Sequence, residues 1–510
     1  SGSSRGSIIM EQFQAPMRSA PHRLGAGKEV PRIAFIAAPL SGHLRLPLAL
    51  AQEMAGRGYA VDFLVGMHGM ATEAQESLRA LQRRCPAVTV HTLAVGRDLA
   101  SSIDFQRVAG SSGRFAGSML ALMEELVAVT GDGKRLGQCV ELWRAMIQVL
   151  ASRMPDLVVM DHVLPLPQLW AEYKGIPTVL MHTSYSSPGA KTGCARMYPW
   201  QKLQLSNFVS TYQPWERLEE RKKDLGIGDG FHVRPVVGGF DARPGVHALA
   251  FCEPELLNVP GQGMPPRVHV VGPCFSQDNE ALDTDLGHWL DEALAQNQRV
   301  LYMSLGTLGN GFLTPVAVRT LLDAFANLGR NWRVLWSLPE AQHPLLERCG
   351  RRLDPDRVRV ERYVRQRAVL AHEAARLFLT HGGQSSVNEA VAAGVPLVCL
   401  PLFCDQYEAA EAVQRHGLGL VFHKDELLRG RHRRLTAVLL RVAGEPLFQG
   451  TVRRHASLMH IRGGCGRAAT VLESIIHGGV DFQELWRGPP RDLSPSGLAD
   501  CLRGVGRLCG

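Results

Sequence analysis

RLFLTHGGQSSVNEAVAAGVPLVCLPLFCDQ, residues 376–406, is the most informative segment of this chain of 510 residues. Its apolar run 377–380 predicts a buried strand, the HGG after it predicts a turn, and the residues that follow begin a helix. A second apolar run, 396–400, predicts another strand. Two strands joined by a helix predict a parallel sheet with helices packed on its faces.

The turn between this strand and this helix has the composition of an anion-binding site. Gly383 lets the backbone approach a ligand, and Ser385 and Ser386 add hydroxyl donors at the start of the helix. The helix N-terminus supplies free N–H groups and about half a positive charge. Doubly wound sheets bind ligands at this edge, outside the carboxyl ends of the strands, so a nucleotide diphosphate fits here.

The same residues also allow a purely structural interpretation. Ser386 and Glu389 have the spacing of a helix capping box, and so do Asp405 and Glu408. On spacing alone, these side chains start helices as readily as they bind a ligand, and both interpretations stay open.

Both halves of the chain alternate strands and helices. The predicted strands are 32–38, 61–65, 157–161 and 177–182 in the first half, and 300–305, 332–338 and 357–360 in the second. A turn at 39–43 leads into a helix with Pro47 in its first turn, and further helices are expected at 166–174, 315–328 and 449–476. The fold class is therefore α/β, with two facing Rossmann-like doubly wound domains.

A glycine- and proline-marked break at 271–273, followed by the polar stretch 276–285, predicts the domain boundary. We expect a tag and N-terminal tail at 1–30, an N-terminal domain at 31–275, a C-terminal domain at 276–475 and a tail at 476–510. The periodicity fades between 183 and 240, where an irregular stretch helps to shape a binding site. Residues that either line that site or belong to the core are Met197, Tyr198, Trp200 and Phe208.

Composition narrows the classes of partner. The formal net charge is +8, but the arginine clusters do not alternate with aromatic residues, which make up 6% of the chain, so we expect solvated faces and no nucleic acid. The 11 cysteines form no CxxC pair, which favours a reducing, cytoplasmic location. No apolar run reaches the ~20 residues of a membrane-spanning helix.

His43 and Asp161 are the candidate catalytic pair of the first half. His43 lies in the turn after the first predicted strand, and Asp161 ends the strand 157–161, so both belong to the carboxyl edge of one parallel sheet. A carboxylate beside an imidazole fixes its tautomer and stabilises the imidazolium, which makes a general base. A structural histidine and a helix-capping aspartate remain the alternative.

Several other motifs do not indicate a site. Asp283-Thr284-Asp285 resembles a metal-binding DxD, but it precedes a helical stretch and reads better as a helix cap. His372-Glu373 lacks the second histidine of a zinc protease motif. No GxGxxG follows the first strand, and we expect neither a metal nor a nicotinamide cofactor.

The segment from residue 363 to residue 406 resembles, without a gap, the signature of UDP-dependent family 1 glycosyltransferases, which have the GT-B fold. The matching residues are Gln366, Leu370, His372, Phe378, Thr380, His381, Gly383, Ser386, Glu389, Gly394, Val395, Pro396, Pro401, Asp405 and Gln406. A weaker resemblance spans most of residues 31–475, including a Gly42-His43 after the first strand.

The resemblance implies a UDP-sugar site made of several kinds of contact. They are uracil stacking by Tyr363, base and ribose contacts from Val364 and Gln366, ribose hydroxyl contacts from Glu389, diphosphate contacts from Ser304, Thr307, His381, Gly383, Ser385 and Ser386, and sugar contacts from Asp405 and Gln406. Plant members have Trp at the position of Tyr363 and Trp-Asn at that of Gln384-Ser385, and in them a Gln at the position of Gln406 accompanies glucose.

The implied function is an inverting, metal-independent transfer of a sugar, with UDP-glucose as the first choice of donor, onto a small hydroxylated acceptor. His43 acts as the base, assisted by Asp161, in a monomer or weak homodimer. Two alternatives are a nucleotide-sugar epimerase or hydrolase on the same fold, and a catalytically inactive nucleotide-sugar-binding protein.

Overall fold

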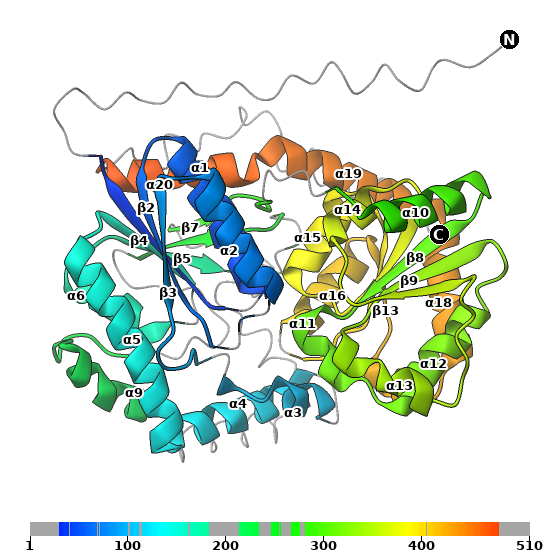
Figure 1. Ribbon diagram of the computed structural model, residues 1–510, viewed down its shortest axis with the longest axis horizontal. Helices are drawn as coiled ribbons and strands as arrows, with labels where there is room; N and C mark the ends of the chain where they lie inside the picture. Colours follow the sequence, from blue (N-terminus) through cyan, green and yellow to red (C-terminus); the bar gives the residue numbers. More distant parts are fainter. Residues whose placement is uncertain are drawn as a thin grey trace, which may run out of the picture.

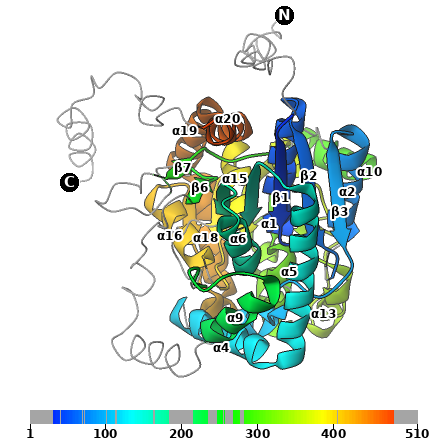
Figure 2. The ribbon, with the colours of Figure 1, turned by 90° about the vertical axis from the view of Figure 1, so that its left-hand side faces the viewer.

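The computed structural model describes residues 30–478 with gaps at 40, 69, 71, 100–101, 112–114, 162–163, 183–213, 234–245, 254–255, 257–266, 276–280 and 404. Two separate parallel sheets with helices around them stand side by side (Figure 1). The expected fold class of two facing α/β domains is confirmed. Figure 2 shows the molecule from the side of the first sheet, with α5 and α6 in front of its strands.

The first sheet has seven strands in the order β3-β2-β1-β4-β5-β6-β7, and neighbouring strands pair in parallel. The strands are β1 Arg32–Ala37, β2 Ala60–Gly66, β3 Val88–Leu93, β4 Leu157–Asp161, β5 Thr178–His182, β6 Val246–Ala250 and β7 Val268–Val270. In β1 every residue after Arg32 is buried, as expected for a strand covered by helices on both faces.

The second sheet has six strands in the order β10-β9-β8-β11-β12-β13, again parallel. They are β8 Arg299–Ser304, β9 Trp332–Ser337, β10 Val358–Glu361, β11 Ala375–Thr380, β12 Leu397–Cys399 and β13 Gly419–Val421. In each sheet the strand order reverses once, between β1 and β4 and between β8 and β11. Such switch points open a crevice at the carboxyl ends of the strands.

Helices cover both sheets. Those of the first half are α1 Ser41–Gly56, α2 Thr72–Arg84, α3 Phe105–Gly110, α4 Phe115–Gly131, α5 Gly133–Arg153, α6 Pro165–Tyr173 and α9 Pro214–Lys222, with the 3-10 turn Lys223–Leu225. Those of the second half are α10 Thr284–Ala295, α11 Gly306–Gly309, α12 Pro315–Ala326, α13 Pro344–Arg348, α14 Gln366–Ala371, α15 Gln384–Ala392, α16 Gln406–Arg415, α17 Lys424–Leu428, α18 His432–Gly444, α19 Pro446–Arg462 and α20 Gly464–Ile476, with 3-10 turns at Asn310–Phe312 and Glu340–Gln342. Within the described ranges, no helix combines the length and apolarity needed to cross a bilayer.

The first helix begins earlier than the sequence predicts. It starts at Ser41, so His43 lies in its first turn rather than in a preceding loop, and Pro47 lies inside the helix. Proline has no N–H with which to bond the carbonyl four residues before it, that of His43, so the helix tolerates Pro47 only at the cost of this bond.

Four strands were not expected from the sequence: β3, β6, β7 and β13. The edge strand β3 is only partly buried, unlike the almost fully buried central strands β1 and β4, and β7 and β13 have three residues each. Short edge strands depend on pairing with a neighbour rather than on their own pattern.

The two halves are bridged by helices that pack on the opposite sheet. The helix α20 packs against α1, with Ala469 and Leu472 in the same apolar cluster as Leu50 and Met54. The expected boundary at residue 475 places α20 with the second half, whereas its apolar face belongs to the first. Figure 1 shows α19 and α20 along the top of the molecule, and α3 and α4 along its base, running from one half toward the other.

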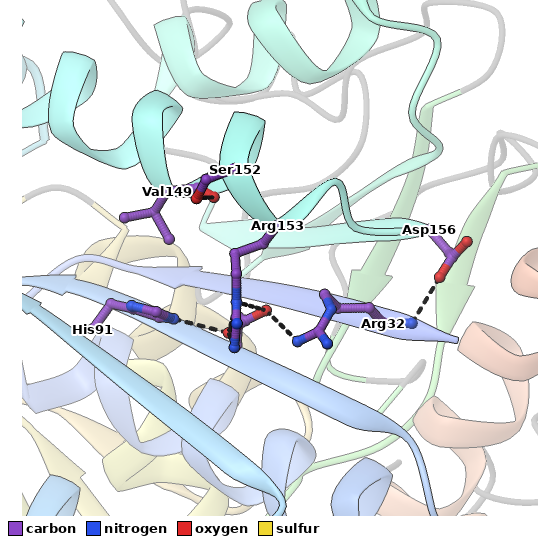
Figure 3. Close-up of polar contacts among 7 residues, drawn as sticks. Arg32, His91, Val149, Ser152, Arg153 and Asp156 are labelled. Carbon is purple, nitrogen blue, oxygen red and sulfur yellow. Dashed lines mark hydrogen bonds and ion pairs between the residues drawn. The ribbon is translucent and has the colours of Figure 1, made fainter. Parts of the chain in front are cut away.

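A buried ion cluster lies at the amino end of the first sheet. Asp62 of β2 is 1% exposed and accepts hydrogen bonds from Arg32 Nη1 at 3.0 Å, Arg153 Nη2 at 3.0 Å and His91 Nε2 at 2.8 Å. Figure 3 shows Arg32, His91 and Arg153 converging from β1, β3 and the end of α5. The cluster joins four elements, β1, β2, β3 and α5, at the edge opposite the crevice.

Candidate functional site

His43 and Asp161 meet at the switch point of the first sheet. The Nδ1 atom of His43 lies 2.6 Å from Oδ2 of Asp161, the last residue of β4. The Asp161 side chain is 1% exposed and that of His43 is 25% exposed. A carboxylate at Nδ1 directs the imidazole so that Nε2 is the atom available to take a proton.

The surroundings raise the pKa of His43. Burial alone would lower it, but the charge of Asp161, its hydrogen bond and the charges of Asp405 and Asp98 together outweigh burial. Asp405 belongs to the other half of the chain, at the N-terminus of α16. Charged residues of both halves therefore contribute to the pKa of His43.

The N-terminus of α15 follows a turn that requires glycine. Gly382 has φ of 84°, a conformation that side chains rarely adopt, and Gly383 is the N-cap residue of α15. A Cβ atom at Gly383 would lie 2.5 Å from Nε2 of His381, and one at Gly306 would lie 2.6 Å from its Cε1. The His381 ring thus fits between two glycine backbones.

Burial lowers the pKa of His381 to about 4, and a hydrogen bond to the Ser304 backbone only partly opposes this shift. The ring is therefore neutral in the ligand-free protein. Ser304 ends β8, and His381 follows β11, so the bond joins the two strands that flank the second switch point. Thr307 lies in α11, and its side chain is outside the described part of the structure.

A hydrogen-bonded group lies beside the first turns of α15. Gln366 Nε2 donates to Glu389 Oε2 at 2.7 Å and to Ser386 Oγ at 3.3 Å, and Tyr302 donates to Gln366 Oε1 at 3.2 Å. Ser386 and Glu389 lie inside α15, which begins at residue 384, so the capping-box interpretation of this pair is wrong. Their side chains face Gln366 instead of the helix start.

Tyr363 and Val364 border the same group. The Tyr363 side chain is 43% exposed, and Val364 is 5% exposed. Both line a cleft of about 1340 Å³ between the two halves, together with Arg45, Ser385 and Glu389. An exposed ring at the wall of a cleft is suited to stacking on a planar base.

Gln406 shapes the loop that precedes α16. It is 4% exposed, and its Oε1 accepts hydrogen bonds from the N–H groups of Leu402 at 2.9 Å and Phe403 at 3.2 Å. With the oxygen engaged, the amide NH₂ is the group with which Gln406 would donate to a ligand.

Three contacts between the two halves were missed by sequence reasoning. Arg45 Nη1 lies 2.9 Å from Glu389 Oε1, and Ser385 Oγ lies 3.5 Å from the Gly42 carbonyl. Gln384, at the position where plant relatives have Trp, is buried and donates to the Phe251 carbonyl at 2.9 Å. The departure of residue 384 from the Trp of plant members was the one signal in the sequence.

Three further expectations concern the Asp283 motif, metal binding and the acceptor-binding residues. Asp283 is the N-cap residue of α10 and accepts from the N–H of Asp285 at 3.0 Å, which confirms the capping interpretation of that motif. Among the residues that the structure describes, no three His, Cys, Asp or Glu side chains group so that they could hold a metal ion. The acceptor candidates Met197, Tyr198, Trp200 and Phe208 lie outside the described residues.

Comparisons with known proteins agree with this geometry. Residues 260–460 match the family model of UDP-glucoronosyl and UDP-glucosyl transferases. The NDP-glycosyltransferase YjiC of Bacillus subtilis (strain 168) is 24% identical over 87% of this chain and 97% of its own. UDP-glycosyltransferase 1 of Phaeomoniella chlamydospora is 30% identical over 40% of this chain, which spans only 41% of that relative.

Solved structures share the arrangement of the two sheets. The glycotransferase of kitacinnamycin superimposes with a TM-score of 0.62 at 20% identity, covering 88% of this chain and 100% of its own. At this identity the likeness shows the fold, with its two facing Rossmann-like halves.

Proposed function

Because the chain belongs to the UDP-glycosyltransferase family of GT-B enzymes, we propose that it transfers glucose from UDP-glucose to a hydroxyl group of a small acceptor, with inversion at the anomeric carbon. In this proposal the second half binds the donor and the first half binds the acceptor. Gln406 supports glucose as the sugar, since plant relatives with Gln at this position use it.

The observation that carries the proposal is the 2.6 Å contact between His43 Nδ1 and Asp161 Oδ2, on the side of the first half that faces α15. Ser385, in the first turn of α15, reaches the Gly42 carbonyl at 3.5 Å, so the base and the proposed diphosphate site are neighbours. An acceptor bound in the first half would therefore meet the donor's reacting carbon.

The reaction would proceed in one displacement. Nε2 of His43 takes the proton of the acceptor hydroxyl while the acceptor oxygen forms a bond to the anomeric carbon. The bond between that carbon and the β-phosphate oxygen breaks, and its electron pair leaves with UDP. Asp161 stabilises the imidazolium that results, and entry and departure on opposite faces invert the configuration.

The charge that develops on UDP would be met by the N-terminus of α15 rather than by a bound cation. Its free N–H groups and partial positive charge favour a diphosphate. His381 would contribute after protonation, because a neighbouring diphosphate raises the pKa that burial has lowered to about 4. The protonated ring donates from both nitrogens, to Ser304 and to a phosphate oxygen.

The proposal is tested by incubating the protein with UDP-glucose and phenolic, terpenoid and lipid acceptors, and reading products by mass spectrometry. We expect a product heavier than its acceptor by one hexose, with UDP released only when acceptor is present. His43→Ala should lower turnover by about 10²–10⁴-fold, because general-base assistance is lost, while UDP affinity stays within about 2-fold.

The exposed His460 of α19 offers a matched control, since His460→Ala removes an imidazole that is not among the residues lining the cleft and should leave turnover unchanged. UDP release without acceptor would indicate a hydrolase, and UDP binding without turnover on the whole panel would indicate an inactive binding protein. Near-normal turnover of His43→Ala would remove His43 from the mechanism.

A further inference from the structure

Arg45 connects the acceptor half to the group that surrounds Glu389. It lies on α1, two residues beyond His43, and its Nη1 is 2.9 Å from Glu389 Oε1. The Arg45 side chain is 45% exposed, whereas that of Glu389 is 4% exposed. The two residues are 344 positions apart, so this ion pair exists only when the two halves are docked.

The carboxylate of Glu389 is held from both sides. Gln366 Nε2 donates to Oε2 at 2.7 Å from the second half, and Arg45 binds Oε1 from the first half. A carboxylate has roughly four lone-pair sites, so two such contacts leave acceptor positions for two further hydroxyl groups. The two contacts fix the plane of the carboxylate but leave some of its acceptor positions open.

We propose that Arg45 is a positioning residue for the donor: it holds Glu389 in the orientation that accepts the ribose hydroxyls, so recognition of ribose depends on docking of the two halves. This inference rests on the proposed function, in which Glu389 binds ribose. The geometry also places an arginine, which keeps its charge at every working pH, at the ribose end of a cleft whose wall includes Tyr363.

The position of Arg45 favours this role over a purely structural one. Its guanidinium lines the cleft together with Glu389, Ser385 and Tyr363, rather than lying in an apolar interface. Almost half of its side chain is exposed, so the ion pair itself adds little to stability. Its effect on the orientation of a buried carboxylate is therefore the larger consequence.

The test compares binding of UDP and 2′-deoxy-UDP by calorimetry, because the two ligands differ only in a ribose hydroxyl. We expect the wild type to prefer UDP by about 10-fold, as for one hydrogen bond to a charged group. Arg45→Met should reduce this preference to about 3-fold or less, with little change in 2′-deoxy-UDP affinity. Arg45→Lys should restore part of the preference.

A double-mutant cycle shows whether Arg45 acts through Glu389. Glu389→Gln should abolish the preference, and adding Arg45→Met should lower it no further, because the two changes remove one shared contact. Arg83→Met is the matched control: it removes an exposed charge of α2 from the wall of the same cleft and should leave the ratio of the two affinities unchanged.

The inference is overturned if Arg45→Met keeps the full preference for UDP, or if it tightens UDP binding, since Arg45 would then compete with ribose. In either case the proposed function still stands if the wild type binds UDP more tightly than 2′-deoxy-UDP. Failure of the wild type to bind UDP would instead sink the proposed function and this inference with it.

Discussion

At the scale of single residues, the charge of Asp161 sets the protonation of His43. Burial by itself would lower the pKa of His43, and Asp161 is the largest of the contributions that raise it instead. The raised pKa makes the imidazole a stronger base, but it also requires a higher pH before the base is free.

Asp161→Asn tests this balance through the pH dependence of kcat/KM. Without the negative charge of Asp161, the pKa of His43 loses its largest upward contribution and falls, so the acid limb should move to lower pH. Turnover should fall by about 10²–10⁴-fold, because the asparagine no longer stabilises the imidazolium. An acid limb that stays in place or moves to higher pH would contradict this account.

Residues that follow strands were easier to predict than residues that meet across the cleft. His43 and Asp161 could be proposed as a pair because parallel strands share a carboxyl edge, and the structure brings them to 2.6 Å. The contact of Arg45 with Glu389 could not be predicted, because it depends on how two separately folded sheets dock. No local pattern in the sequence encodes that docking.

At the scale of elements, β1, β2, β3 and α5 are joined by the ion cluster around Asp62. Burial would raise the pKa of Asp62, but hydrogen bonds from His91, Arg153 and Arg32 outweigh it and lower the pKa. A lowered folded-state pKa means that this stabilisation is present above the unfolded value of about 3.9 and is lost as pH falls through the folded value.

Asp62→Asn should lower the free energy of unfolding by about 2 kcal/mol near neutral pH, less than for a fully buried pair because the arginines are partly exposed. The difference between wild type and variant should shrink below about pH 4, as Asp62 itself becomes protonated. Denaturant unfolding across pH measures both effects.

Asp229→Asn is a suitable control, since this side chain is 85% exposed and its removal should change stability little at any pH. A deficit of Asp62→Asn that persists unchanged well below pH 4 would show that packing, not charge, explains it. Turnover should be unaffected once the variant is folded, because the cluster lies at the edge opposite the cleft.

Element types were predictable where burial is complete on both faces. The central strands β1, β4, β8 and β11 are continuous apolar runs, and their sequence indicates them directly. The capping-box interpretation of α15 failed because the helix begins two residues before Ser386. The glycine turn at Gly382 and Gly383, rather than a capping side chain, sets where the helix starts.

At the scale of the whole molecule, Lys424 joins the two halves of the chain. Its side chain is 2% exposed, and Nζ donates to the carbonyls of Ala109 at 2.9 Å and Ser111 at 2.8 Å from the first half and Leu402 at 3.0 Å from the second. A single ammonium group therefore satisfies three backbone acceptors that come from both sides.

Lys424→Met should lower the free energy of unfolding by about 2–3 kcal/mol, because buried carbonyls lose their donor. Burial lowers the pKa of Lys424 to about 8, below the unfolded value of about 10.4. The unfolded chain then binds more protons between these two values, so the advantage of the wild type over the variant should widen from pH 8 to pH 10.

Lys134→Met, which removes an exposed lysine at the start of α5, provides the comparison and should show neither effect. An advantage that stays constant over this pH range would mean that Lys424 keeps its proton in the folded protein. Faster hydrogen exchange of α3 in Lys424→Met would locate the loosened contact.

The general architecture was predictable from the alternation of strands and helices, but the sharing of helices between the halves was not. The sequence of an amphipathic helix such as α20 shows that one face is apolar. It does not show which sheet that face will cover. The choice depends on the path of the chain after α19, which lies beyond any local pattern.

The return of α20 to the first sheet has a practical corollary for anyone recombining this chain with its relatives. A chimera with a single junction at the expected domain boundary, between residues 275 and 276, would take its first sheet from one parent and α20 from the other. The apolar surface around Leu50 and Met54 would then pack against a helix from a different protein. The donor half could instead be transplanted as an insert with two junctions, the second placed at the glycine pair Gly463-Gly464. Each sheet would then keep the α20 helix or the surface that comes from its own parent.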